Sequence, residues 1–67
     1  MFNIDDLKRK RLLSKDEAAF YIGVCVKTIT VLMKEEGFPV VRIGHNRGRV
    51  FIHREKLDEW IDKKAEG

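Results

Sequence analysis

The chain has 67 residues, of which 43% are hydrophobic and 37% are charged, and its formal net charge is +3 at pH 7. A chain of this length builds one small core with little interior for an enclosed substrate pocket, which disfavours an enzyme and predicts a protein without catalytic residues. The longest apolar run, residues 18–22, is far shorter than the roughly 20 residues that cross a bilayer, and no signal-peptide pattern opens the chain. The lone cysteine, Cys25, cannot form an internal disulfide. We therefore expect a cytoplasmic protein without membrane contact.

Positive charge is concentrated in two segments. The first holds Lys8, Arg9, Lys10 and Arg11, and the second runs from residue 40 to residue 54 without a single Asp or Glu. The last thirteen residues are acidic on balance. A charged run is often only a solvated surface, but two acid-free basic segments favour a polyanionic partner.

The first helix of the expected domain has a clear beginning and end. Residues 1–10 show no helical or strand period, so they are expected to form a basic N-terminal arm that precedes a domain spanning residues 11–65. Ser14 and Glu17 have the spacing of a capping box, which predicts a helix over residues 15–22. Gly23 is suited to end that helix.

A second helix follows almost at once. Cys25 stands at its cap position, residues 26–36 carry apolar side chains at helical spacing, and Gly37 is expected to close it. Two helices joined by so short a connection must cross, as in a helix-turn-helix.

Residues 38–54 change to an alternating pattern, with glycines at both ends of the connecting segment 44–48. This predicts a β-hairpin in which Val41 and Ile43 point one way and Arg42 the other, and in which Val50 and Ile52 alternate in the same manner with Arg49 and Phe51. A third helix over residues 54–64 is predicted from its apolar side chains at i, i+3 and i+4. The resulting fold class is α+β, a small winged helix with the order helix, helix, β-hairpin, helix.

This architecture predicts binding to duplex DNA. The second helix fits the major groove, and the hairpin tip can reach the minor groove or the phosphates. The side chains expected on the exposed side of the helix are Lys27, Thr28, Thr30, Val31 and Lys34. Those expected on the hairpin are Arg42, His45, Asn46, Arg47 and Arg49, with Arg47 in the minor groove and Arg42 and Arg49 on phosphates. The arm Lys8, Arg9, Lys10 and Arg11 is expected to add an electrostatic contact.

The sequence resembles the excisionase family of small winged helix proteins. The segments that carry the resemblance are 13–19 (LSKDEAA), 21–24 (YIGV), 28–29 (TI), 32–34 (LMK), 38–44 (FPVVRIG) and 57–61 (LDEWI). The resemblance implies a bacterial DNA-binding accessory protein of a phage or conjugative element, associated with the nucleoid when bound. Such a protein binds beside a tyrosine-type integrase, bends the DNA, favours excision of the mobile element in DNA recombination, and can self-associate on DNA.

Other functions remain open at this stage. A small transcriptional regulator and the DNA-recognition subunit of a phage packaging enzyme use the same layout. A protein-docking winged helix is the alternative from another class, with Phe20, Val26 and Val31 as candidate contact residues. Cys25, His45 and His53 lack the spacing of a compact metal site, so no metal or other cofactor is expected.

Overall fold

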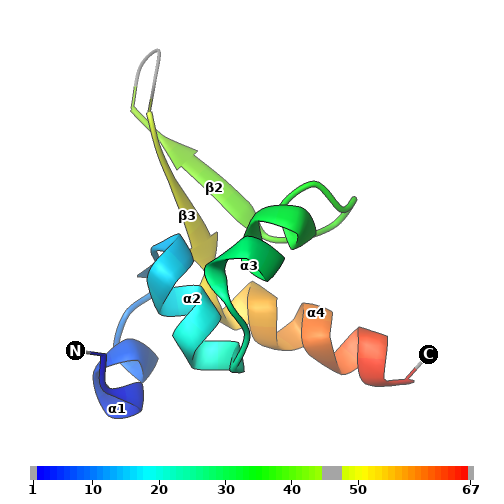
Figure 1. Ribbon diagram of the computed structural model, residues 1–67, viewed down its shortest axis with the longest axis horizontal. Coiled ribbons are helices and arrows are strands. Elements are labelled where there is room, and N and C mark those ends of the chain that lie inside the picture. The colour runs from blue at the N-terminus through cyan, green and yellow to red at the C-terminus, as the bar shows by residue number, and fades with distance from the viewer. Residues whose placement is uncertain (1, 45–47, 67) are drawn as a thin grey trace.

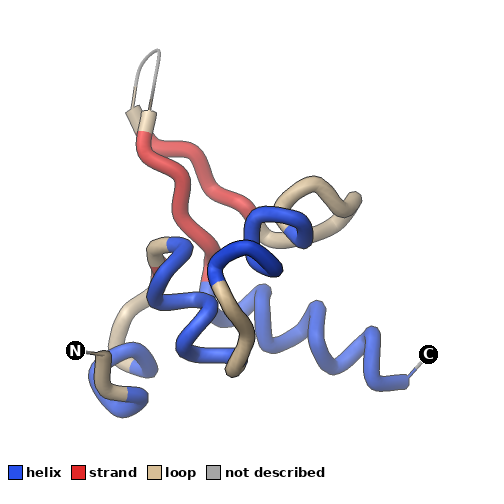
Figure 2. The backbone as a smooth tube through the Cα atoms, viewed as in Figure 1, coloured by secondary structure: helices blue, strands red, loops and turns tan. Residues whose placement is uncertain are grey.

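The computed structural model describes residues 2–44 and 48–66, and within them it has the predicted α+β winged helix architecture (Figure 1). Its elements are α1 (Ile4–Lys8), β1 (Leu12–Leu13), α2 (Lys15–Ile22), α3 (Val26–Leu32), β2 (Val40–Ile43), β3 (Arg49–His53) and α4 (Arg54–Glu66). The hairpin β2–β3 projects beyond the helices, and α3 lies beside its base (Figure 2). No helix in the described part of the chain is long and apolar enough to span a membrane.

The predicted capping box of α2 is confirmed. Ser14 Oγ accepts a hydrogen bond from the Glu17 N–H at 3.2 Å, and Glu17 Oε1 accepts one from the Ser14 N–H at 2.9 Å. Gly23 ends the helix with φ of 78°, a left-handed conformation that side chains rarely adopt. The chain turns there within three residues and enters α3.

Helix α3 is shorter than the predicted helix over residues 26–36. Its last i−4 bond is donated by the Met33 N–H to the Ile29 carbonyl, after which the Lys34 and Glu35 N–H groups bond three residues back. Five of its seven residues are β-branched, and the carboxylates of Glu35 and Glu36 are unfavourable near a helix C-terminus. The helix therefore ends at Leu32, and a run of turns leads to β2.

The three strands form an antiparallel sheet in the order β1-β3-β2. Val40 is paired with Ile52, and Val41 with Phe51, so residues opposite each other share a face. Ile52 is fully buried, which makes Val40 the inward residue of β2 and places Val41 on the outer face. The predicted alternation within each strand is confirmed, and the register adds that Val41 and Ile43 lie on the face opposite to Val50 and Ile52.

Helix α1 corrects the expectation that residues 1–10 lack regular structure. Asn3 caps it by accepting a hydrogen bond from the Asp5 N–H at 2.9 Å, and Leu7 is buried in the core with 2% exposure. Five residues are too few to show a helical period in the sequence. The segment is thus anchored by tertiary packing.

The core lies between the inner face of the sheet and the helices. Leu13, Ile29, Ile52 and Leu57 are fully buried, and they belong to β1, α3, β3 and α4 respectively. The partly buried residues packed against the core include Tyr21, Ile22, Leu32, Met33, Trp60 and Ile61. The apolar positions predicted for the three helices are thus confirmed as core or core-contacting residues.

Candidate nucleic-acid interface

Helix α3 has one buried side and one exposed side. Ile29 is fully buried, while Lys27, Thr28, Thr30 and Val31 are exposed, as the helical period predicts. Val31 is 60% exposed, so it is available for apolar contact such as that with a thymine methyl group. This side of α3 offers one cation, two hydroxyl groups and an apolar surface.

The two threonine hydroxyls of α3 already have partners within the helix. Thr30 Oγ1 donates to the Val26 carbonyl at 3.1 Å, and Thr28 Oγ1 lies 3.3 Å from Cys25 Sγ. Hydrogen bonding to Thr28 lowers the pKa of the exposed Cys25 thiol. Thr30 therefore has acceptor capacity left but has used its proton.

Lys34 does not belong to α3. Its N–H bonds the Val31 carbonyl at 3.1 Å in the turn that follows the helix. The prediction that Lys34 lies on the recognition helix is wrong because α3 ends at Leu32. Its exposed side chain projects from a turn, where it is better placed for a phosphate than for a base edge.

The hairpin exposes Arg42 and Arg49 on opposite faces of the sheet. Arg42 is paired with Val50, and Ile43 with Arg49. Because neighbouring pairs along the strands point to opposite faces, the two guanidinium groups lie on different sides of the sheet. They therefore cannot hold one phosphate from the same side. His45, Asn46 and Arg47 lie outside the described residues, and Arg47 in the minor groove stays a prediction.

The backbone at Gly48 lies close to the backbone of Ile43 and Gly44, where the hairpin loop begins. A Cβ atom on Gly48 would lie 2.5 Å from the Ile43 carbonyl oxygen, a distance that real Cβ atoms do not show. Gly48 is therefore required where β3 returns past the end of β2.

The basic arm is only partly available for an external anion. Lys8, Arg9 and Arg11 are exposed, whereas Lys10 Nζ forms an ion pair with the Glu17 carboxylate. Partial burial raises the pKa of Glu17, but the hydrogen bonds from Lys10 and Ser14 outweigh it and hold this pKa below its ordinary value. The sequence could not reveal this pair, because α1 brings Lys10 to the start of α2.

A set of three side chains, which we name the brace, joins α2 to the start of α4. The Tyr21 hydroxyl donates to the Asp58 carboxylate at 3.0 Å, and Arg54 Nη1 lies 3.7 Å from the same carboxylate. Arg54 Nε also donates to the Lys10 carbonyl at 2.7 Å. Arg54 thus acts within the scaffold, although it belongs to the acid-free basic segment of the sequence.

Cations differ in pairing between the scaffold and the candidate interface. Those with a carboxylate within 4.0 Å are Lys10, Arg54, Lys56 and Lys64. Within residues 2–44 and 48–66, no such partner is found for Lys27, Lys34, Arg42 or Arg49. The charges of α3 and the hairpin are therefore left for an external anion.

Phe20 is exposed, as the helical period of α2 predicts, but it has a partner. Its side chain is 45% exposed, and its ring lies 5.8 Å from that of Phe2 in an edge-to-face arrangement. Phe20 as a protein contact stays a prediction.

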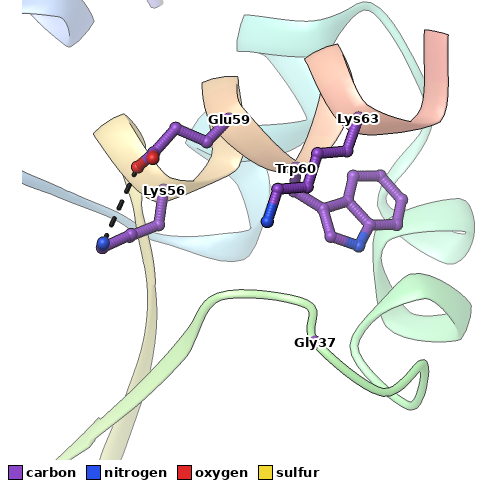
Figure 3. A pocket seen from close by; sticks show the side chains of 5 residues that line it. All are labelled: Gly37, Lys56, Glu59, Trp60 and Lys63. Atoms are coloured by element: carbon purple, nitrogen blue, oxygen red, sulfur yellow. Dashed lines mark ion pairs between the residues drawn. The ribbon is translucent and has the colours of Figure 1, made fainter. Parts of the chain in front are cut away.

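A small pocket lies between α4 and the turn before β2 (Figure 3). It measures about 160 Å³ and is lined by Gly37, Lys56, Glu59, Trp60 and Lys63. Lys56 and Glu59 pair with each other at 3.7 Å, and the Trp60 ring packs edge-to-face on Phe38 at 5.0 Å. Small-molecule sites are commonly about 300–1,000 Å³, so this hollow is too small for one.

A protein-family model described as a helix-turn-helix domain matches residues 12–65, which include every element from β1 to the last turn of α4. Comparisons with curated proteins and with solved structures gave no match.

Proposed function

The chain belongs to the helix-turn-helix domain family of small, excisionase-like DNA-binding proteins, and on this premise we propose that it acts as a recombination directionality factor. In this role it binds duplex DNA, bends it and assists a tyrosine-type integrase in excising a mobile element. DNA binding itself is the property of the family, whereas the excision role is our proposal.

The observation that carries the proposal is the set of cations without carboxylate partners on α3 and the hairpin. Lys27 and Arg49 stand on two elements that a winged helix applies to neighbouring grooves. Lysine and arginine side chains that replace counterions on phosphates supply most of the affinity for DNA. Lys10, Arg54, Lys56 and Lys64 of the scaffold do have carboxylate partners, and this contrast supports the assignment.

Individual roles follow from position. Lys27 and Thr28, in the first turn of α3, are assigned to base edges, and Val31 to an apolar base contact. Lys34, Arg42 and Arg49 are assigned to phosphates, with Arg42 and Arg49 serving opposite sides of the hairpin. Lys8, Arg9 and Arg11 add nonspecific attraction.

The excision role is supported by the family resemblance alone. The same resemblance supports the proposal that copies of the protein associate with each other on DNA. A transcriptional regulator or a packaging subunit would use the same residues on DNA, so the interface does not distinguish them. No catalytic residue or cofactor belongs to the proposal, since the protein's contribution is to shape the DNA for an integrase.

The test begins by selecting preferred duplexes from a random library and measuring the bend by the mobility of permuted fragments. Selected duplexes are then placed beside the core site of a tyrosine integrase in a purified excision assay. We expect the protein to raise excision and to lower integration. A selected site that binds without bending and without changing recombination would contradict the excision role while leaving DNA binding intact.

Two variants sharpen the assignment. Lys27→Ala is expected to reduce the preference for the selected duplex over random DNA, because base contacts carry specificity. Arg49→Ala is expected to weaken binding to both duplexes equally, because a phosphate contact carries none. The reverse pattern would contradict the assigned roles.

A further inference from the structure

The outer face of the sheet is largely apolar, and the residues at its base are only partly buried. Leu12 is paired with His53, and Val41 with Phe51, so these four side chains share the face opposite to the core residues Leu13 and Ile52. A sheet with one solvated face normally carries polar residues there. Here three of the four are apolar, and Ile43 extends the strip while being 49% exposed.

A hollow lies at the base of this face. It measures about 270 Å³ and is lined by Arg11, Leu12, Val41 and His53. Because β1 pairs with the last two residues of β3, the hollow is at the end of the hairpin remote from residues 44–48. The loop is one of the two parts through which a winged helix docks on DNA, and this hollow lies at the other end of the hairpin from it.

The polar groups of the hollow are suited to a carboxylate. His53 Nδ1 accepts a hydrogen bond from the Lys56 N–H at 3.3 Å, so the proton of the neutral ring is on Nε2, which remains available as a donor. Arg11 supplies an exposed guanidinium group, and none of the four lining residues is acidic. Apolar side chains beside two donors complement an apolar segment that carries carboxylates.

We propose that this face, which we name the outer-face groove, is a docking surface for an acidic amphipathic helix of another protein. The apolar side of the helix packs on Leu12, Val41 and Phe51, and its carboxylates bind Arg11 and His53. DNA is a poorer occupant, because the strip offers hydrocarbon where phosphates need donors. The proposal goes beyond DNA binding and does not depend on it, since it concerns the base of the outer face, whereas Arg49 lies at the other end of that face beside the loop.

The probe is a 14-residue synthetic peptide with leucine at helical i, i+3, i+4 and i+7 positions and glutamate at most others. Binding is followed by fluorescence anisotropy and by amide chemical shifts of the ¹⁵N-labelled full chain. We expect saturable binding, with shift changes centred on Leu12, Val41, Phe51 and His53. Two matched peptides, one with lysine for glutamate and one with serine for leucine, are expected to bind at least fivefold more weakly.

Val41→Thr is the decisive variant, because threonine keeps the shape and the strand preference of valine but introduces a hydroxyl group. It is expected to weaken peptide binding about fivefold or more, since a buried hydroxyl without a partner is costly, while the affinity for duplex DNA stays unchanged. Lys27→Ala is the matched control, with unchanged peptide affinity and reduced DNA affinity. The melting temperature of Val41→Thr verifies that the variant is folded.

Several outcomes would overturn the proposal. These are shift changes centred on α3, equal binding by Val41→Thr, competition of the peptide with a short duplex for the same residues, and a dimer of the free chain that Val41→Thr dissociates. Because peptide binding is measured without DNA, a general loss of duplex affinity would count only against the proposed DNA function.

Discussion

The scaffold contains cations with carboxylate partners, whereas the cations of the proposed DNA-binding surface have none within the described residues. In the scaffold, Arg54 binds the Asp58 carboxylate and the Lys10 carbonyl, and Lys10 binds Glu17. On α3 and the hairpin, Lys27 and Arg49 have no ion pair within residues 2–44 and 48–66. A net charge of only +3 therefore underestimates the charge available to a polyanion, because the acids are used mainly by the scaffold and α4.

The two sides of α3 differ most in burial, since one side belongs to the core and the other to the proposed DNA-binding surface. Ile29 is fully buried and Val31 is 60% exposed. Ile29→Ala is expected to lower the free energy of unfolding by about 3 kcal/mol through lost burial and a cavity, whereas Val31→Ala should change it by less than about 0.5 kcal/mol. Urea unfolding followed by circular dichroism measures both. Similar losses for the two variants would mean that α3 has no free side.

The brace is expected to contribute stability without contributing to DNA binding. Tyr21→Phe removes the hydroxyl that donates to Asp58 and should cost about 1.5 kcal/mol, the lower end of the range for a hydrogen bond to a charged group, because the Asp58 side chain is 45% exposed. Burial raises the pKa of Tyr21, and so does the bond to Asp58. Duplex affinity measured well below the melting temperature should match that of the wild type. A selective loss of affinity would place the brace in the interface.

The pair Lys10–Glu17 tests whether the arm is held by its own chain. Glu17→Gln retains a capping acceptor but removes the charge, and the expected cost at pH 7 is about 0.5 kcal/mol, since Lys10 is half-exposed. The pKa of Glu17 is lowered in the folded state, so its contribution is complete at neutral pH and is lost as the pH falls below the ordinary value of 4.5.

Chemical denaturation at a series of pH values follows the difference between wild type and Glu17→Gln. It should shrink as the pH is lowered through and below 4.5. A difference that persists unchanged into strong acid would show that the charge of Glu17 is not what stabilises the fold.

The smallest expected effect concerns the start of α3. Cys25 occupies the N-cap with extended backbone but makes no capping hydrogen bond. Cys25→Ser should therefore raise the free energy of unfolding by about 0.5 kcal/mol, because serine is a preferred cap. Thermal melting measures the change. A lower melting temperature would indicate that the contact of Cys25 Sγ with Thr28 contributes more than a serine cap.

Local signals in the sequence predicted α2 and its ends, since Ser14, Glu17 and Gly23 act through neighbouring backbone groups. The helical periods of α3 and α4 likewise identified Ile29 and Leu57 as core residues. These features need only a few residues of context.

Features that depend on tertiary structure could not be predicted from the sequence. Strand β1 has two residues, and α1 is fixed by the burial of Leu7. The hairpin register was ambiguous because both faces are apolar, and a five-residue connection does not determine it. For the same reason the outer-face groove could not be predicted, because its residues come from β1, β2 and β3.

The sequence predicted those parts of the candidate site that lie on one helix. It did not predict those that depend on strand register or on ion pairs between distant residues. Exposure of Lys27 and Val31 followed from the period of α3. The placement of Arg42 and Arg49 on opposite faces follows only from the strand register. The ion pair of Lys10 with Glu17 follows only from the position of α1.

The most direct test of the central claim is the salt dependence of duplex affinity for the wild type and Arg49→Ala. If the cations assigned to phosphates, together with those of the arm, neutralise about five phosphates, a plot of log affinity against log salt concentration has a slope of about −4 to −5. Arg49→Ala should then flatten it by about 1. A slope near zero for the wild type would contradict binding through these cations, and an unchanged slope for the variant would remove Arg49 from the interface.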